Sequence, residues 1–124
     1  MLEPMVRGSN ADLPVLVVDD QEETRNALVR LLRLQGYAVV TAPDGEAALD
    51  YLRRSSVALI VMDLEMPNVD GWILRRRLLE DPALARIPVV VFSARAAGNL
   101  PAIAFVRKSD PTGLLDAIER EYPH

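Results

Sequence analysis

Five short apolar runs recur along the chain, separated by more polar segments. Each run has the length of a strand, is rich in β-branched residues and shows no apolar/polar alternation. Strands that are apolar on both faces are typical of a parallel sheet covered by helices on both sides. The pattern therefore predicts five buried parallel strands at Pro14–Val18, Tyr37–Thr41, Val57–Met62, Pro88–Phe92 and Ala102–Val106.

The segments between these runs have the period of amphipathic helices. In the first, Thr24, Leu28, Leu31 and Gln35 form one stripe with Leu32 beside it, and Gly36 follows as a stop. Asp44 is placed to cap the second helix, and Pro111 occupies a tolerated first-turn position of the last. The predicted helices are Glu22–Gln35, Gly45–Arg54, about Gly71 to Glu80, and Pro111–Tyr122.

Alternating strands and helices predict an α/β fold with a doubly wound, five-stranded parallel sheet in the order 2-1-3-4-5. One crossover is short: after Ser93 only Ala94 to Pro101 precede the fifth strand, whereas an average helix needs about 11 residues. The helix between the fourth and fifth strands is predicted to be reduced or absent, with no helix longer than about two turns there. Residues 1–13 lack periodicity and are expected to be a flexible leader to one domain at 14–124.

Composition narrows the classes of function. The chain has 124 residues, half of them apolar, and a net charge of −4, which argues against a nucleic-acid surface. No apolar run is long enough to cross a bilayer and no signal segment is recognisable, so we expect a soluble, cytoplasmic protein without a membrane partner. The absence of cysteine excludes thiolate metal sites. The run Arg75-Arg76-Arg77 is interpreted as a solvated helix face.

Polar side chains stand at the ends of the predicted strands. Asp19 and Asp20 follow the first strand and Asp63 the third, which are neighbours at the point where the strand order reverses. Ligands of doubly wound sheets bind at that point. Ser93 follows the fourth strand and Lys108 the fifth, so all five side chains are expected at one edge of the sheet.

Four stretches carry a resemblance to a known family. They are similar to motifs of the receiver domains of bacterial response regulators, the CheY-like proteins of two-component signalling. The stretches are VLVVDD, VMDLEMPNVDGWIL, VVVFSA and AFVRKSD. The similarity covers about residues 14–122. It implies that Asp63 is the phosphoacceptor, and that Mg²⁺ is bound by Asp19, Asp20, Asp63 and the backbone carbonyl of Glu65. Carboxylates are competent nucleophiles for phosphoryl transfer, and Mg²⁺ prefers hard oxygen ligands.

The resemblance also implies roles for the later motifs. Lys108 would supply a positive charge and Ser93 a hydroxyl to the phosphoryl oxygens. Ser93 and Phe105 would form the switch, although Phe105 is nearly as well explained as a core aromatic. The family usually has proline after the lysine, but here Ser109 follows Lys108. A non-proline cis bond costs about 2.5–4 kcal/mol, which favours a trans bond and leaves open how Lys108 is aimed.

The leading hypothesis is therefore a stand-alone receiver, not an enzyme, that takes phosphate from a histidine kinase or phosphotransfer protein and changes its contacts with an unknown downstream protein. Because the usual dimerising face would lack a helix, we expect a monomer or a weak dimer. An alternative is a phosphorylation-independent interaction module on the same fold. A third possibility, a phosphatase or a flavin carrier, would want a cap over the substrate or a glycine-rich phosphate loop after the first strand.

Overall fold

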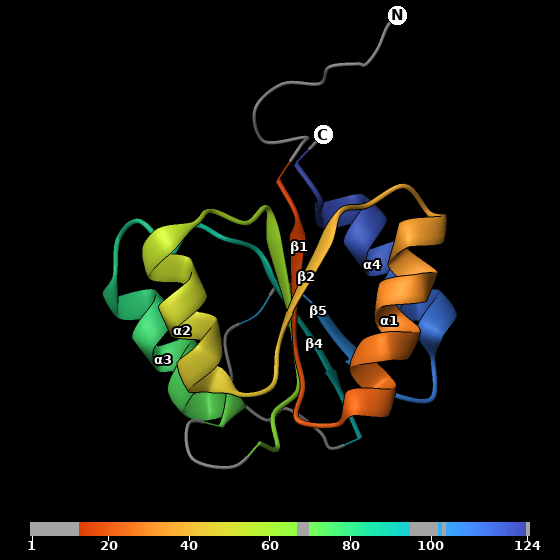
Figure 1. The fold of residues 1–124 in the computed structure, drawn as a ribbon, viewed down its shortest axis with the longest axis horizontal. Helices are drawn as coiled ribbons and strands as arrows, with labels where there is room; N and C mark the ends of the chain where they lie inside the picture. Colours follow the sequence, from red (N-terminus) through yellow and green to blue (C-terminus); the bar gives the residue numbers. More distant parts are fainter. Residues whose placement is uncertain (1–12, 67–69, 95–101, 103, 124) are drawn as a thin grey trace, which may run out of the picture.

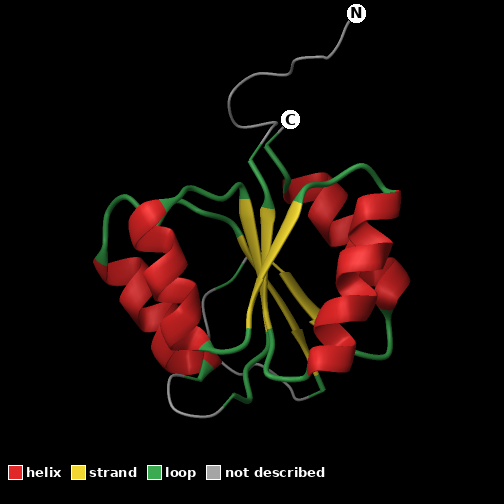
Figure 2. Cartoon of the chain, viewed as in Figure 1, coloured by secondary structure: helices red, strands yellow, loops and turns green. Residues whose placement is uncertain are grey.

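The computed structural model describes residues 13–66, 70–94, 102 and 104–123. A central sheet lies between two pairs of helices (Figure 1, Figure 2). The strands are β1 (Val15–Val18), β2 (Val39–Ala42), β3 (Leu59–Met62), β4 (Val89–Ser93) and β5 (Ala104–Arg107). The helices are α1 (Glu22–Leu34), α2 (Gly45–Arg54), α3 (Gly71–Glu80) and α4 (Pro111–Glu121).

The strands pair in the order β2-β1-β3-β4-β5, and every pair is parallel. The register aligns their ends: Val18, the last residue of β1, lies opposite Ala42 of β2 and Met62 of β3. The predicted doubly wound fold is confirmed. All strands consequently deliver the residues that follow them to one edge of the sheet.

The core has two halves, one on each face of the sheet. Leu16 and Val18 pack with α2 and α3, whereas Val15 and Val17 pack with α1 and α4, and all four are fully buried. Figure 1 shows the corresponding helix pairs on opposite sides of the sheet. Burial on both faces is the reason that the strands appear in the sequence as continuous apolar runs.

Local signals set the helix ends. Asp44 accepts a hydrogen bond from the Ala47 N–H (2.8 Å), as predicted for the N-cap of α2. Asp110 caps α4 in the same way through the Gly113 N–H (2.9 Å). Beyond α1, Gly36 has a φ of 94°, a conformation that favours glycine and ends the helix.

Two predicted boundaries are corrected by packing. The sequence places Tyr37 in the second strand, but β2 begins at Val39 and the Tyr37 ring packs against Tyr122 with centroids 5.0 Å apart. The Tyr37 side chain is apolar because it packs against the end of α4, and not because it belongs to the strand. Similarly, Gln35 is exposed beyond the end of α1, and the buried stripe of that helix consists of Leu28 and Leu32.

One predicted surface residue is buried. Arg75 in α3 is 7% exposed, on the same side of the helix as Leu74 and Leu78, and this burial lowers the pKa of its guanidinium. The interpretation of Arg75-Arg76-Arg77 as a solvated face is wrong for Arg75 and correct for Arg76 and Arg77, which are exposed.

The two ends of the described chain meet. The Tyr122 hydroxyl at the end of α4 donates a 2.6 Å hydrogen bond to the Leu13 carbonyl, just before β1. In Figure 1 this junction lies at the edge of the sheet away from the β1–α1 turn. The expected leader at residues 1–13 otherwise lies outside the described residues.

The connection between β4 and β5 comprises ten residues, 94–103. The described part of the chain has four helices, and none of them belongs to this connection. The more detailed prediction, that no helix exceeds two turns between Ser93 and Ala102, falls on residues outside that part. Among the described helices, none has the length and apolar character needed to cross a membrane.

Candidate functional site

Three carboxylates and one ammonium group meet where the strands end. Asp19 and Asp20 follow β1, Asp63 follows β3 and Lys108 follows β5. One ligand oxygen from each acid lies within 4.8 Å of the others. The Lys108 Nζ lies 2.9 Å from Asp19 Oδ2 and 3.1 Å from Asp63 Oδ2. The predicted convergence of these four side chains is therefore present.

Burial distinguishes the three acids. Asp19 and Asp63 are 2% and 5% exposed, whereas Asp20 is exposed. Two buried carboxylates repel each other unless a cation lies between them. Burial alone would lower the pKa of Lys108, but hydrogen bonds and charge attraction to Asp19 and Asp63 outweigh it and raise that pKa. The ammonium of Lys108 is thus held charged as the counter-ion of both acids.

Backbone contacts orient Asp63. Its Oδ1 accepts a hydrogen bond from the Leu64 N–H (2.8 Å), so Oδ2 is the oxygen left for Lys108. Its own N–H donates to the Val18 carbonyl (3.0 Å), which extends the β1–β3 pairing into the site. The first residue of α3, Gly71, lies against the peptide that follows: a Cβ there would stand 2.4 Å from the Asp63 carbonyl oxygen.

Asp19 is held at every polar atom. Its N–H donates to the Ala42 carbonyl (3.2 Å), and its Oδ1 accepts from the Gln21 N–H (2.9 Å). Its carbonyl oxygen accepts from the Arg25 Nη1 (2.8 Å), and its Oδ2 pairs with Lys108. The contact of Arg25 was not predicted. The sequence offers no signal for this contact, because nothing in it distinguishes Arg25 from Arg30 and Arg33 on the same helix.

Of the remaining predicted residues, Ser93 and Glu65 lie at the same edge of the sheet, and Phe105 lies within β5, opposite Val91. Ser93 ends β4, is 2% exposed, and its carbonyl accepts the Lys108 N–H (3.1 Å). Glu65, two residues after Asp63, is exposed. Phe105 in β5 is 47% exposed, so it is not a buried core aromatic in this structure. The Lys108–Ser109 bond is trans, and Lys108 nevertheless reaches both acids.

The donor set suits a hard divalent cation. The candidate ligands are carboxylate oxygens, and the exposed Asp20 leaves a side open to water, which Mg²⁺ keeps in its coordination shell. Lys108 uses one oxygen of Asp19 and one of Asp63. A cation at the cluster would therefore compete with the ammonium for those oxygens.

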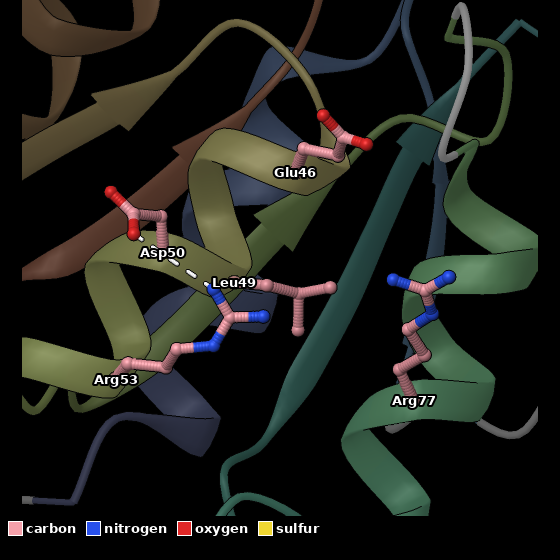
Figure 3. Close-up of a pocket in the computed structure, with 5 residues that line it drawn as sticks. All are labelled: Glu46, Leu49, Asp50, Arg53 and Arg77. Carbon is pink, nitrogen blue, oxygen red and sulfur yellow. Dashed lines mark ion pairs between the residues drawn. The ribbon is translucent and has the colours of Figure 1, made fainter.

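Two cavities can be compared with this site, one beside it and one away from it. One, of about 330 Å³, is lined by α1 residues, Phe92, Pro111 and Lys108. The other, of about 350 Å³, lies between α2 and α3, where Figure 3 shows Leu49 between Arg53 and Arg77. Its lining charges are mixed, and it contains none of the three clustered acids. The acid cluster remains the site with defined chemistry.

Comparison with known families identifies the class. Residues 15–115 match the model of the response regulator receiver domain. The chain therefore belongs to the response regulator receiver domain family, as its sequence motifs indicated.

Individual proteins agree with this assignment. The chain is 39% identical over 97 residues to the gliding motility regulatory protein of Myxococcus xanthus, a match that covers 77% of this chain and 12% of that protein. The chain thus spans a small part of that relative. A response regulator receiver protein from Pseudomonas putida is 29% identical, with a TM-score of 0.83 over 90% of this chain and 98% of that one.

A third comparison concerns the fold alone. The receiver domain of the sensor histidine kinase PA1611 from Pseudomonas aeruginosa PAO1 is 23% identical, with a TM-score of 0.81 over 90% of this chain and 98% of that one. It was solved with a magnesium ion coordinated in the active site cleft.

Proposed function

We propose that residues 14–124 form a receiver that accepts one phosphoryl group on Asp63 from a histidine kinase or phosphotransfer protein, in a reaction that requires Mg²⁺. The observation that carries the proposal is the contact of Lys108 with Asp63 Oδ2 beside two further clustered carboxylates. Phosphoryl transfer needs little covalent chemistry beyond a positioned nucleophile and stabilised charge.

The step is a displacement at phosphorus. A carboxylate oxygen of Asp63 forms the new P–O bond while the P–N bond to the donor histidine breaks, and the released imidazole takes up a proton. Asp19, Asp20, Asp63 and the Glu65 carbonyl would hold Mg²⁺, which would supply positive charge to neutralise the phosphoryl oxygens. Lys108 faces one of these oxygens and the Ser93 hydroxyl another.

The output is a change in protein contacts. A phosphoryl group adds charge and acceptor oxygens, which draw Lys108 and the Ser93 hydroxyl toward it. Phe105 lies on the neighbouring strand with about half of its surface exposed, and its ring is the element whose position would change with Ser93. The domain so described acts on itself and not on a separate substrate, works in the cytoplasm, and signals to a downstream protein.

The test uses the purified chain with Mg²⁺ and acetyl phosphate as the phosphoryl donor. Intact-mass measurement should show one added phosphoryl group in the wild type, and none in Asp63→Asn or after chelation of Mg²⁺. Asp20→Asn should stay folded and require more Mg²⁺ for the same rate. Equal modification of wild type and Asp63→Asn would contradict the proposal, and an unmodified wild type would favour a phosphorylation-independent interaction module.

A further inference from the structure

We propose that Arg25 is a positioning residue for the acid pair, and that its hydrogen bond to the Asp19 carbonyl orients the carboxylate of Asp20 for Mg²⁺. The proposal rests on the function proposed above. It starts from the 2.8 Å contact between Arg25 Nη1 and Asp19 O.

The Asp19 carbonyl lies where sheet pairing stops. The β1 ladder ends at Val18, opposite Ala42 and Met62. A backbone carbonyl at such a place needs a donor from elsewhere. Arg25 supplies it with a charged guanidinium, and a hydrogen bond from a charged donor is about twice as strong as a neutral one.

Arg25 is itself anchored across the same turn. Its backbone N–H donates to the Gln21 carbonyl (3.0 Å), and the Gln21 N–H donates to Asp19 Oδ1 (2.9 Å). The peptide between Asp19 and Asp20 is therefore fixed from both its side-chain and its carbonyl side. The Asp20 side chain is exposed to solvent, and the orientation of this peptide sets the direction of its Cα–Cβ bond, from which the carboxylate extends.

Charge and position predict opposite effects at this residue. A positive guanidinium close to the acids repels Mg²⁺, so if it acted only as a charge, its removal would strengthen Mg²⁺ binding. If it positions the acids, its removal weakens binding despite the lost repulsion. The sign of the change therefore identifies the role.

The experiment compares Arg25→Met, Arg25→Lys and Arg30→Met in the full chain. Arg30→Met is the matched control, because it removes the same charge from an exposed site on the same helix. The apparent Kd for Mg²⁺ is measured by the fluorescence of Trp72. This residue directly follows Gly71, which packs against the backbone of Asp63. It is measured independently from the Mg²⁺ dependence of phosphorylation by acetyl phosphate.

The positioning role predicts that Arg25→Met needs roughly tenfold more Mg²⁺, which corresponds to the loss of one charge-assisted hydrogen bond, and that Arg25→Lys, which keeps a charged donor, is affected less. Their phosphorylation rates at saturating Mg²⁺ should stay close to that of the wild type, and Arg30→Met should be unchanged. Tighter or equal Mg²⁺ binding in a folded Arg25→Met overturns the inference while the proposed function stands. A wild type that neither binds Mg²⁺ nor becomes phosphorylated overturns the proposed function and the inference with it.

Discussion

Lys108 compensates two buried negative charges with one ammonium group. Asp19 and Asp63 are almost fully buried, and each lies about 3 Å from the Lys108 Nζ. The resemblance of the sequence to receiver domains implied, in the form of a metal ion, a positive partner for these acids. The structure adds that a side chain of the protein already provides one. A metal ion that bound here would therefore enter a site whose charge is already partly balanced.

Replacing Lys108 with Met should destabilise the protein in the absence of Mg²⁺ and make it more responsive to Mg²⁺. Losing hydrogen bonds from a charged donor to buried acids should lower the free energy of unfolding by about 2 kcal/mol. The same change removes a competitor for the carboxylate oxygens, so Mg²⁺ should raise the melting temperature more than in the wild type.

Thermal melts with and without Mg²⁺ measure both effects. Arg107→Met, which removes a charge from the preceding exposed residue, serves as the control. A Lys108→Met protein whose melting temperature rises with Mg²⁺ no more than that of the wild type would show that the ammonium and the metal do not compete.

At the scale of single residues, the positions of site groups were predictable and their contacts were not. A residue directly after a parallel strand must emerge at the carboxyl edge, so Asp19 and Asp63 could be placed from the apolar runs alone, and Lys108, two residues after the fifth run, could be placed nearby. The reach of Arg25 back to Asp19 depends on the rotamer of a long side chain, and no sequence pattern encodes it.

Among the elements, α3 and the end of β3 are the most closely fitted. A Cβ on Gly71 would lie 2.4 Å from the Asp63 carbonyl oxygen and 2.7 Å from the Leu64 Cα. Both are backbone atoms, so neither can move aside as a flexible side chain would. The small residue at the start of α3 lets the helix support the segment that carries Asp63.

Gly71→Ala should push α3 away from this segment. Such overpacking should cost about 1–3 kcal/mol of stability. It should also slow the proposed phosphorylation of Asp63, because the Asp63 carboxylate shifts with its carbonyl. The free energy of unfolding comes from urea denaturation, and the rate from intact mass with acetyl phosphate.

Gly36→Ala provides a control with a similar loss of stability, because Gly36 follows the C-terminal end of α1, away from Asp63. Gly36 has a positive φ, and a Cβ added there would meet no atom within 4 Å, so alanine is strained by about 1–2 kcal/mol through its backbone alone. Gly36→Ala should be destabilised without a change in rate. Equal phosphorylation rates in Gly71→Ala and Gly36→Ala would show that the packing of α3 does not determine the position of Asp63.

Element types were predictable because the fold buries β1, β3 and β4 throughout, and the partly exposed β2 and β5 keep enough apolar residues to be recognised. The ends of the elements, however, were set by tertiary contacts. The apolar run that starts at Val57 includes Ala58, and both are buried before β3 begins at Leu59. Tyr37 likewise packs against Tyr122 before β2 begins. Packed residues continue beyond the ends of the hydrogen-bonded strands. An apolar sequence pattern follows this packing and not the hydrogen bonding, so it predicts strands that are too long.

At the scale of the whole molecule, the charged site and the aromatic contact lie at opposite edges of one sheet. Burial, the charge of Glu119 and the nearby Tyr122 raise the pKa of Tyr37 above its ordinary value. The folded state therefore favours the neutral phenol. Its contribution to stability is complete below about pH 10 and is lost as the pH rises through the raised pKa.

Tyr37→Phe should accordingly be less sensitive to alkali than the wild type. Urea denaturation at several pH values from about 8 to about 11 should show a smaller loss of stability in the variant, since phenylalanine cannot ionise. Tyr51→Phe, on α2, controls for the loss of a phenol elsewhere. A wild type and a Tyr37→Phe variant that lose stability in parallel would assign the alkaline loss to other groups.

The hydrogen bond between Tyr122 and Leu13 determines how the domain bears mechanical load. A pull applied at residues 13 and 122 meets this bond first, because it joins the two points of attachment. Beyond it, β1 is held by ladders to β2 and β3 that run in its own direction, so tension along β1 loads those hydrogen bonds in shear. The last helix, in contrast, can unwind from its end one turn at a time. Tension would therefore be absorbed by α4, while β1 and the acids that follow it keep their register.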